Sequence, residues 1–250
     1  MRIATWNLNN RVGKVRFRPE AALASIALDV DVLVLTEFYP KQHEQSFRAV
    51  LADAGWIHQV MSTDTGAVAN RVLIASRVSV EPLAIALPDF DAQFPSNIAT
   101  AHLPSIGLSL VGVRVPMYKA ETLPLLEKAW DWLEGTARLL VNRPALILGD
   151  LNVATNSPVS RRGNQFRNVL ANGWKRADVM SGASFYGSSG VRSEIDHILG
   201  TRYCEFSDAE YVQSVGRVRL AGMPDAISDH AALACQVAVL GTADDLADGL

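Results

Sequence analysis

The sequence predicts an α+β fold in which two β-sheets pack face to face and helices cover their outer surfaces. Short strand-like runs dominate the chain, and helical periods fall between pairs of these runs. A sheet has to bury its apolar face against another layer, so this alternation favours two packed sheets with helices outside. We expect residues 1–240 to form one domain, followed by an acidic, flexible tail at 241–250.

The strands are recognised in chain order from their apolar patterns. RIATWNL alternates from Ile3, and VDVLVLTE is almost entirely apolar, as expected of a strand that is covered on both faces. Six further runs have the same character: GAVANRVLIASR, SNIATAHL, LSLVGVRV, ALILG, IDHIL and AALACQVAVL.

Four helices are expected between these strands. In residues 121–140, apolar side chains recur at spacings of three and four, which places them on one helix face. Residues 19–28 and 43–54 have similar patterns, and RRGNQFRNVLANGW indicates a short helix that ends at Gly173.

Composition limits the function classes. With 49% hydrophobic and 20% charged residues, the 250-residue chain can bury a large core. A net charge of -3 argues against a protein that coats nucleic acid, although a local basic patch remains open. Cys204 and Cys235 lie in apolar runs without metal-site spacing, so two buried thiols in a reducing compartment are expected.

No targeting or membrane segment is expected. The N-terminus has no apolar signal region, and the most apolar stretch is interrupted by Asp29 and Asp31. We therefore expect a cytoplasmic protein without a membrane span, and we infer no obligate protein partner.

Polar side chains that can carry chemistry lie at the ends of five predicted strands. These residues are Asn7, Glu37, Asp150 with Asn152, Asp196 next to His197, and Asp229 with His230. A single Asp or Asn after a strand is usually a turn residue. Several carboxylates at one end of a core, however, would repel one another and would be costly to desolvate.

A divalent cation is the simplest positive partner for such a group. The side chains offer oxygen atoms and there is no Cys or His cluster, which favours Mg²⁺ or Mn²⁺. Sites of this kind occur in phosphoryl chemistry, where an Asp–His pair can transfer a proton or donate a charged hydrogen bond. From the residues alone we expect metal-dependent cleavage of a phosphate ester.

The same segments resemble the endonuclease/exonuclease/phosphatase superfamily. The matching segments are TWNLN at 5–9, LTE at 35–37, LILGDLN at 146–152, EIDHIL at 194–199 and SDHAAL at 228–233, together with NRVLIASR at 70–77. The resemblance implies a four-layer α/β/β/α sandwich with two mixed β-sheets, and a hydrolase that uses Mg²⁺ or Mn²⁺.

The resemblance also implies residue roles. Glu37 is similar to the main metal ligand, with Asn7 and Asp229 as further metal contacts. Asp150 resembles the residue that orients or deprotonates the attacking water, and Asn152 resembles one that holds the phosphate. His230 is similar to the histidine at the scissile phosphate, and Asp196 to its carboxylate partner.

The chain departs from the family pattern at three places. Asn9 stands where many relatives have Asp, and Thr36 precedes Glu37 where many have Gln. Arg114 stands where relatives carry a tyrosine or histidine. An arginine can bind the phosphate through a fixed charge but cannot exchange protons at neutral pH. Tyr118 is a weaker candidate for the missing side chain.

Three functions remain open at this point. The favoured one is a nuclease or related phosphodiesterase acting on nucleic acid. Basic runs at 11–18, 160–167 and 216–220 adjoin the motifs and could guide a polyanion, and the aromatic candidates for base stacking are Phe17, Phe166, Phe185 and Tyr186. The alternatives are a phosphatase or phosphodiesterase for a small or lipid phosphate ester, and a non-catalytic binding module.

Overall fold

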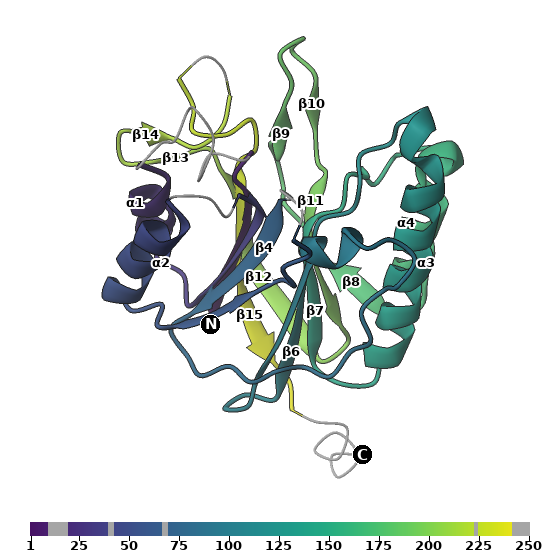
Figure 1. Cartoon of the computed structure of the whole chain (residues 1–250), viewed down its shortest axis with the longest axis horizontal. Helices are drawn as coiled ribbons and strands as arrows, with labels where there is room; N and C mark the ends of the chain where they lie inside the picture. Colours follow the sequence, from purple (N-terminus) through teal and green to yellow (C-terminus); the bar gives the residue numbers. More distant parts are fainter. Residues whose placement is uncertain (10–19, 40–42, 67–69, 223–224, 242–250) are drawn as a thin grey trace.

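Two mixed β-sheets lie face to face and two pairs of helices cover their outer faces, which confirms the four-layer sandwich (Figure 1). The computed structural model describes residues 1–9, 20–39, 43–66, 70–222 and 225–241. The basic run at 11–18 with Phe17, and residues 242–250 of the expected tail, lie outside the described residues.

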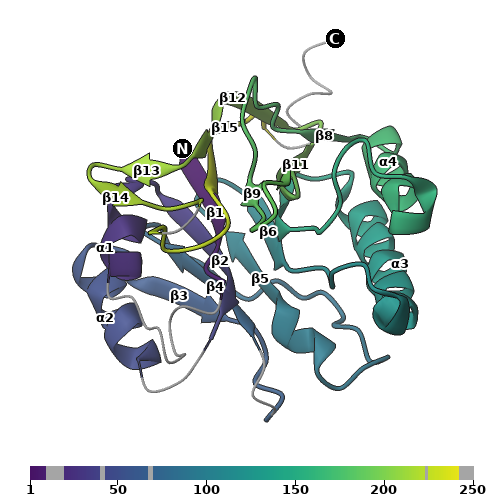
Figure 2. The same ribbon diagram turned by 90° about the horizontal axis from the view of Figure 1, so that it is seen from above.

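The first sheet has six strands and carries the N-terminal motifs. Its strand order is β12 (Cys204–Val212), β15 (Ala232–Val239), β1 (Arg2–Asn7), β2 (Val32–Phe38), β4 (Arg71–Ser76) and β3 (His58–Met61). Strands β1 and β2 are parallel, and the other neighbours are antiparallel. Helices α1 (Glu20–Ala27) and α2 (Glu44–Asp53) cover its outer face (Figure 2).

The second sheet has five strands and carries the Gly-Asp motif. Its order is β5 (Ile98–Leu103), β6 (Leu108–Val113), β7 (Ala145–Asp150), β11 (Asp196–Thr201) and β8 (Trp174–Arg176), with β6 and β7 parallel. Helices α3 (Leu123–Leu140) and α4 (Gly163–Ala171) pack on its outer face. Three 3₁₀ turns are η1 (Phe94–Asn97), η2 (Ala120–Thr122) and η3 (Val159–Arg161).

Two small hairpins extend from the sandwich. One consists of β9 (Phe185–Tyr186) and β10 (Arg192–Ser193), and the other of β13 (Ser214–Val215) and β14 (Val218–Arg219). In Figure 1 the β9–β10 hairpin rises above the ends of the two sheets, and the β13–β14 hairpin lies to its left.

The apolar strands are explained by burial on both faces. In β2, Val32 and Val34 point into the core between the sheets, whereas Leu33 and Leu35 pack under helices α1 and α2. Because successive side chains of a strand point to opposite faces, a strand between two apolar layers loses the usual polar alternation. The same reasoning applies to β7, where Ile147 faces the helices.

The eight strands and four helices expected from the sequence are present, with ends that differ by a few residues. The missed strands are β3, β8, β9, β10, β12, β13 and β14. Most are two to four residues long, and β12 alternates only weakly because several of its side chains are exposed. Cys204 and Cys235 are buried free thiols, as expected. None of the helices in the described part of the chain is long and apolar enough to span a membrane.

One aromatic candidate for base stacking is wrong. The ring of Phe166 has no exposed surface and packs between Trp130, at 6.4 Å, and His197, at 4.8 Å, measured between ring centroids. It belongs to the core under α3 and α4, because its position on the inner face of α4 turns it away from solvent.

Candidate active site

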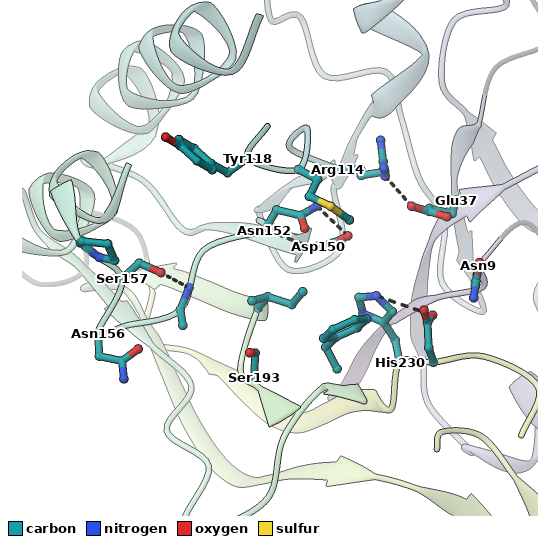
Figure 3. A pocket seen from close by; sticks show the side chains of 16 residues that line it. Asn9, Glu37, Arg114, Tyr118, Asp150, Asn152, Asn156, Ser157, Ser193 and His230 are labelled. Atoms are coloured by element: carbon teal, nitrogen blue, oxygen red, sulfur yellow. Dashed lines mark hydrogen bonds and ion pairs between the residues drawn. The ribbon is translucent and has the colours of Figure 1, made fainter. Parts of the chain in front are cut away.

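The motif residues meet in one cleft of about 570 Å³ at the ends of the strands (Figure 3). Strands β1 and β2 approach from the first sheet, and β7 with the segment after β6 approaches from the second. The β9–β10 hairpin and the residues just before β15 complete its wall. Segments from most of the chain length therefore contribute to a single site.

Six of the eight candidate residues line this cleft: Glu37, Arg114, Asp150, Asn152, Asp229 and His230. The other two, Asn7 and Asp196, lie directly behind the lining residues, where they are almost completely buried and hydrogen bond to Asp150 and His230. The five strand ends that the sequence singled out are thus brought together.

Asp150 lies on the floor of the cleft because Gly149 lets β7 approach its neighbour closely. A Cβ at Gly149 would lie 2.0 Å from the carbonyl oxygen of Val113, and its φ of +142° is accessible to glycine but rarely to other residues. The backbone N–H of Val115 then donates to the Asp150 carbonyl at 2.9 Å. The close packing of β6 and β7 therefore fixes the position of the Asp150 backbone, from which the carboxylate extends.

Three hydrogen bonds hold the Asp150 carboxylate. Asn7 Nδ2 donates to Oδ2 at 2.9 Å, Asn152 Nδ2 donates to the same oxygen at 3.0 Å, and the Asn152 backbone N–H donates to Oδ1 at 3.0 Å. Burial and the neighbouring charge of Asp196 nevertheless raise the pKa of Asp150 to about 7. A carboxylate with a pKa near neutrality is suited to accept a proton at physiological pH.

Asn152 is committed to this arrangement. Its φ is +50°, a left-handed conformation that asparagine tolerates better than most residues. Its Nδ2 donates to the Val115 carbonyl at 2.8 Å as well as to Asp150. Both amide hydrogens are therefore used by the protein, and the expected contact with a phosphate requires one of these bonds to be exchanged.

His230 and Asp196 form a buried charge-assisted pair. His230 Nδ1 lies 2.7 Å from Asp196 Oδ2, and the His230 carbonyl accepts a hydrogen bond from Trp6 Nε1 at 2.8 Å. Burial lowers the pKa of His230, but the opposing effect of Asp196 and of the nearby Asp150 and Asp229 is larger and raises it to about 10. The imidazole is therefore protonated at neutral pH, and His230 lines the cleft.

Glu37 and Arg114 lie next to each other at one side of the cleft. Arg114 Nε donates to Glu37 Oε1 at 2.8 Å, and the two side chains are only 21% and 13% exposed (Figure 3). Glu37 has a φ of +50° and lies where the pairing of β2 with β4 shifts register. Such an irregularity turns a side chain out of the regular strand alternation.

His197 follows Asp196 but has a different role. Its ring is buried, its Nε2 lies 2.7 Å from the carbonyl oxygen of Val153, and burial lowers its pKa to about 4. It is therefore a neutral core residue that donates to the backbone, and it does not line the cleft.

Sequence reasoning gave no site role to Asn9 and Ser228, and it named Phe185 only as a candidate for base stacking. Asn9, noted only as a departure from the family pattern, lines the cleft with a φ of +48°. Phe185 packs 5.2 Å from the His230 ring, and Ser228 Oγ accepts from the His230 N–H at 3.0 Å. The serine immediately before the Asp-His pair was a usable signal, since serine often binds a backbone N–H two residues on. No pattern in the chain indicated that the Phe185 strand returns to the site.

The basic runs are placed unequally. In the run 160–167, Arg162 pairs with Glu127, and Arg167 donates to the carbonyl oxygen of Ser157 at 3.0 Å. Ser157 itself lines the cleft. In the run 216–220, Leu220 is buried, whereas Arg219 lines a second hollow on the far side of the β9–β10 hairpin.

The donor chemistry of the cleft fits one hard divalent cation. Four carboxylates gather here, from Glu37, Asp150, Asp196 and Asp229, and they face two cationic groups, Arg114 and His230. The buried Oδ1 atoms of Asp196 and Asp229 have no hydrogen-bond partner among the described residues. Excess negative charge with unsatisfied oxygens is what a divalent ion would balance.

The protein does not supply a complete ligand cage by itself. The described residues contain no group of three or more His, Cys, Asp and Glu side chains placed to hold a metal ion. Glu37 and Asp229 are the donors in the cleft that would hold Mg²⁺. The Oδ1 of Asn7, the third predicted contact, accepts from the Asn9 N–H at 2.8 Å behind the lining residues. An ion held by few protein ligands keeps water and substrate phosphate in its coordination shell, as Mg²⁺ commonly does.

The fold and this oxygen-rich cleft define a phosphoesterase. A model of the endonuclease/exonuclease/phosphatase family matches residues 4–230, and the chain belongs to that family. A search of curated proteins finds no significant match.

Solved structures with the same fold include several enzymes. The 3′ phosphatase NExo from Neisseria, bound to a product DNA hairpin, has a TM-score of 0.74 and 22% identity, covering 95% of this chain and 99% of its own. The 3′-5′ exonuclease NExo from Neisseria meningitidis has a TM-score of 0.71 and 24% identity, covering 94% of this chain and 99% of its own. An AP endonuclease from Archaeoglobus fulgidus has a TM-score of 0.70 and 22% identity, covering 96% of this chain and 100% of its own.

Proposed function

We propose that this protein is a divalent-metal-dependent phosphodiesterase that cleaves nucleic acid. The observation that carries the proposal is the buried carboxylate of Asp150, with a pKa near 7, in the same cleft as the His230–Asp196 pair. Attack of water on a phosphate is helped by a base that titrates near neutrality and by an imidazolium that is protonated at neutral pH.

Asp150 accepts the proton of the attacking water. Its Oδ2 is fully used by Asn7 and Asn152, whereas Oδ1 accepts one backbone hydrogen bond and keeps a lone pair. That arrangement orients the carboxylate before the substrate arrives, so little reorganisation accompanies proton transfer.

His230 and Arg114 stabilise negative charge on the phosphate. With a pKa of about 10, His230 remains protonated at neutral pH and acts as a charged donor, and it can protonate the leaving oxygen. Arg114 uses Nε for Glu37, which leaves its terminal nitrogens as donors for phosphate oxygens. A bound Mg²⁺ would supply Lewis-acid stabilisation of the phosphate and would be held by Glu37 and Asp229.

The surroundings of the cleft favour a nucleic-acid substrate. Phe185 presents a ring beside His230, and the hollow that adjoins the cleft is lined by Tyr186 and by polar side chains. Aromatic rings next to a phosphate site suit a ligand whose phosphates alternate with flat bases.

Hydrolysis by the wild type and Asp150→Asn tests the proposal. The substrates are bis-p-nitrophenyl phosphate and single-stranded and double-stranded oligonucleotides, each with Mg²⁺, Mn²⁺ or EDTA. We expect metal-dependent hydrolysis that falls by about 10²-fold or more in Asp150→Asn, as for the loss of a general base. Asp131→Asn, an exposed position on α3, is the matched control and should keep wild-type rates.

Three results would reject the proposal. Hydrolysis that persists in EDTA would rule out the metal, and equal rates for Asp150→Asn and Asp131→Asn would rule out Asp150 as the base. A wild type that binds but hydrolyses none of the substrates would favour the non-catalytic module.

Arg114 favours a second candidate, a phosphatase that removes a terminal phosphate. A phosphate monoester carries a charge of about -1.5 to -2 at pH 7, more than a diester, and a fixed guanidinium charge binds the more negative group better. An oligonucleotide with a 3′-terminal phosphate, compared with the same strand bearing a 3′-hydroxyl, separates the two: phosphate release without shortening of the strand identifies the phosphatase.

A further inference from the structure

The β9–β10 hairpin divides the catalytic cleft from a second region of hollow surface. On its far side lies a hollow of about 540 Å³, reached by way of another of about 460 Å³. Tyr186, Arg192 and Gln213 line both of these hollows, and the smaller one shares Asn156 and Ser193 with the catalytic cleft. The three depressions therefore form one path around the hairpin.

Strand geometry places the two aromatic residues of β9 on opposite sides of this divider. Phe185 lines the catalytic cleft and packs 5.2 Å from His230, whereas Tyr186 lines the two far hollows. Successive side chains of a strand point to opposite faces, so this placement follows from the backbone and does not depend on a side-chain rotation.

The hairpin is fixed to the catalytic backbone. The Tyr186 N–H donates to the Asp229 carbonyl at 2.8 Å, and the Ala231 N–H donates to the Ser184 carbonyl at 2.7 Å. These bonds lie on both sides of His230. Whatever binds at Tyr186 is consequently held at a set position relative to the reacting phosphate.

The far hollows have the chemistry of a nucleotide site. Arg192 pairs across the hairpin with Tyr186, and its guanidinium carbon lies 5.6 Å from the centre of the tyrosine ring. Arg219, from the β13–β14 hairpin, lines the larger hollow. A tyrosine with an adjacent guanidinium is a stacking surface for a base, and a second arginine nearby can bind a backbone phosphate.

The arginines on these hairpins are not neutralised by carboxylates of the described residues. Arg192, Arg217 and Arg219 are exposed and form no ion pair with any described residue, whereas Arg176, beside the same region, is bound by Glu194 at 2.9 Å. Uncompensated cations cost little when solvated, and they attract a polyanion. The net charge of -3 therefore conceals a local positive surface next to the cleft.

We propose that the path around the β9–β10 hairpin binds the nucleotides that flank the scissile phosphate in a single-stranded nucleic acid. One base stacks on the Tyr186–Arg192 pair, and a backbone phosphate is bound by Arg219. The inference rests on the proposed function for the reaction itself, but it concerns a binding site outside the catalytic cleft and can be tested by binding alone.

Strand binding by protein that carries Asp150→Asn, which prevents cleavage, is the test. Fluorescence anisotropy with labelled oligothymidylates, a tetranucleotide and a dodecanucleotide, is measured across a range of NaCl concentrations. The variants are Arg192→Gln combined with Arg219→Gln, and Tyr186→Ala with Tyr186→Phe as its conservative partner. Arg143→Gln is the matched control, because Arg143 is exposed, makes no ion pair with a described residue and precedes β7 at the end opposite Asp150.

The expected results follow from the contacts. The double arginine variant should bind the dodecanucleotide about 10-fold more weakly or worse, with a salt slope reduced by about 0.7 for the one phosphate contact that Arg219 makes. Tyr186→Ala should lose about 5- to 150-fold in affinity, the range for removing one stacking ring, and Tyr186→Phe should keep wild-type affinity. The tetranucleotide should distinguish the variants less than the longer strand does.

Two outcomes would overturn the inference. One is equal affinity and equal salt slope for the double variant, Tyr186→Ala and Arg143→Gln, and the other is no strand binding by any of them. Hydrolysis of bis-p-nitrophenyl phosphate by the wild type judges the proposed function separately. No hydrolysis together with weakened binding in the hairpin variants would reject the function and keep the nucleic-acid site.

Discussion

Replacing Arg114 by glutamine should change substrate turnover and metal affinity in opposite directions. Arg114 donates Nε to Glu37 at 2.8 Å and also lines the cleft in which we propose that the substrate phosphate binds. Glutamine keeps a polar side chain but removes the charge. The loss of this charge should weaken the interaction with the anionic substrate and should leave the carboxylate of Glu37 more available to a metal ion.

The magnitude follows from the burial of the pair. At 21% and 13% exposure, neither side chain is freely solvated, so the screening that makes surface pairs nearly neutral is reduced. A hydrogen bond to a charged group contributes about 1.5–3 kcal/mol, which corresponds to about 10- to 150-fold in an equilibrium or rate constant. We expect kcat/KM for a phosphate ester to fall by about that factor.

Mg²⁺ affinity should rise in the same variant. Glu37 no longer shares its charge with a guanidinium, and the cationic neighbour that repels the ion is gone, so the affinity should increase by about 10-fold. Isothermal titration calorimetry with MgCl₂, in the absence of substrate, measures this directly. Arg114→Lys keeps the charge but loses the fork geometry, so it should show an intermediate kcat/KM and nearly unchanged metal binding.

Measured together, kcat/KM and Mg²⁺ affinity can refute this prediction in two ways. If Arg114→Gln lowers both turnover and Mg²⁺ affinity, the arginine supports the metal site structurally and does not compete for Glu37. If turnover is unchanged while Mg²⁺ binds more tightly, Arg114 has no contact with the substrate phosphate.

Three further predictions concern stability and reactivity. His197 stays neutral in the fold down to its pKa of about 4, whereas the unfolded chain protonates it near 6.5, so the unfolding free energy should fall by about 3 kcal/mol between pH 7 and pH 4. Urea unfolding at both pH values should show that His197→Gln lacks this part of the loss. An equal loss of unfolding free energy in the wild type and in His197→Gln would contradict the prediction. Gly149→Ala should destabilise the protein by more than about 2 kcal/mol, because the added Cβ would collide with Val113. Gly135→Ala, in an open position on α3, should stabilise it by about 0.5–1 kcal/mol. Thermal unfolding compares the two variants, and similar melting temperatures would refute the packing argument. Burial raises the pKa of Cys235 to about 12 and that of Cys204 above its usual value, so both thiols should react with a disulfide reagent only in denaturant, and fast labelling of the native protein would be the contrary result.

The fold was predictable where the sequence obeys simple periodicity. Strand β2 reads as a buried strand because Val34 faces the core between the sheets and Leu35 faces the helices, and both partners are apolar. The β9–β10 hairpin has four paired residues and depends on contacts with His230 and Asp229, which are more than thirty residues away. Short strands that are stabilised by distant partners leave no local pattern to read.

The sequence indicated which residues meet at the site and that Asp196 pairs with His230, but it did not indicate that Arg114 pairs with Glu37. Asn7, Glu37 and Asp150 are recognisable because each ends an apolar strand with a polar side chain, and parallel β1 and β2 must deliver theirs to the same edge. That Arg114 would bind Glu37 depends on the turn of the chain after β6 and on the register shift in β2. Neither feature is encoded by residue type alone.

The conflict between stability and function explains why these features coincide. Asn9, Glu37 and Asn152 all adopt left-handed backbone conformations, which are uncommon for residues other than glycine, and all three line one cleft. The same cleft gathers carboxylates that raise the pKa of Asp150 to about 7. A fold optimised for stability alone would relieve both the backbone strain and the repulsion between carboxylates. Their presence at one place, held by the tightly packed Gly149 and by the His230–Asp196 pair, supports the proposal that a cation and a phosphate bind at this end of the sandwich.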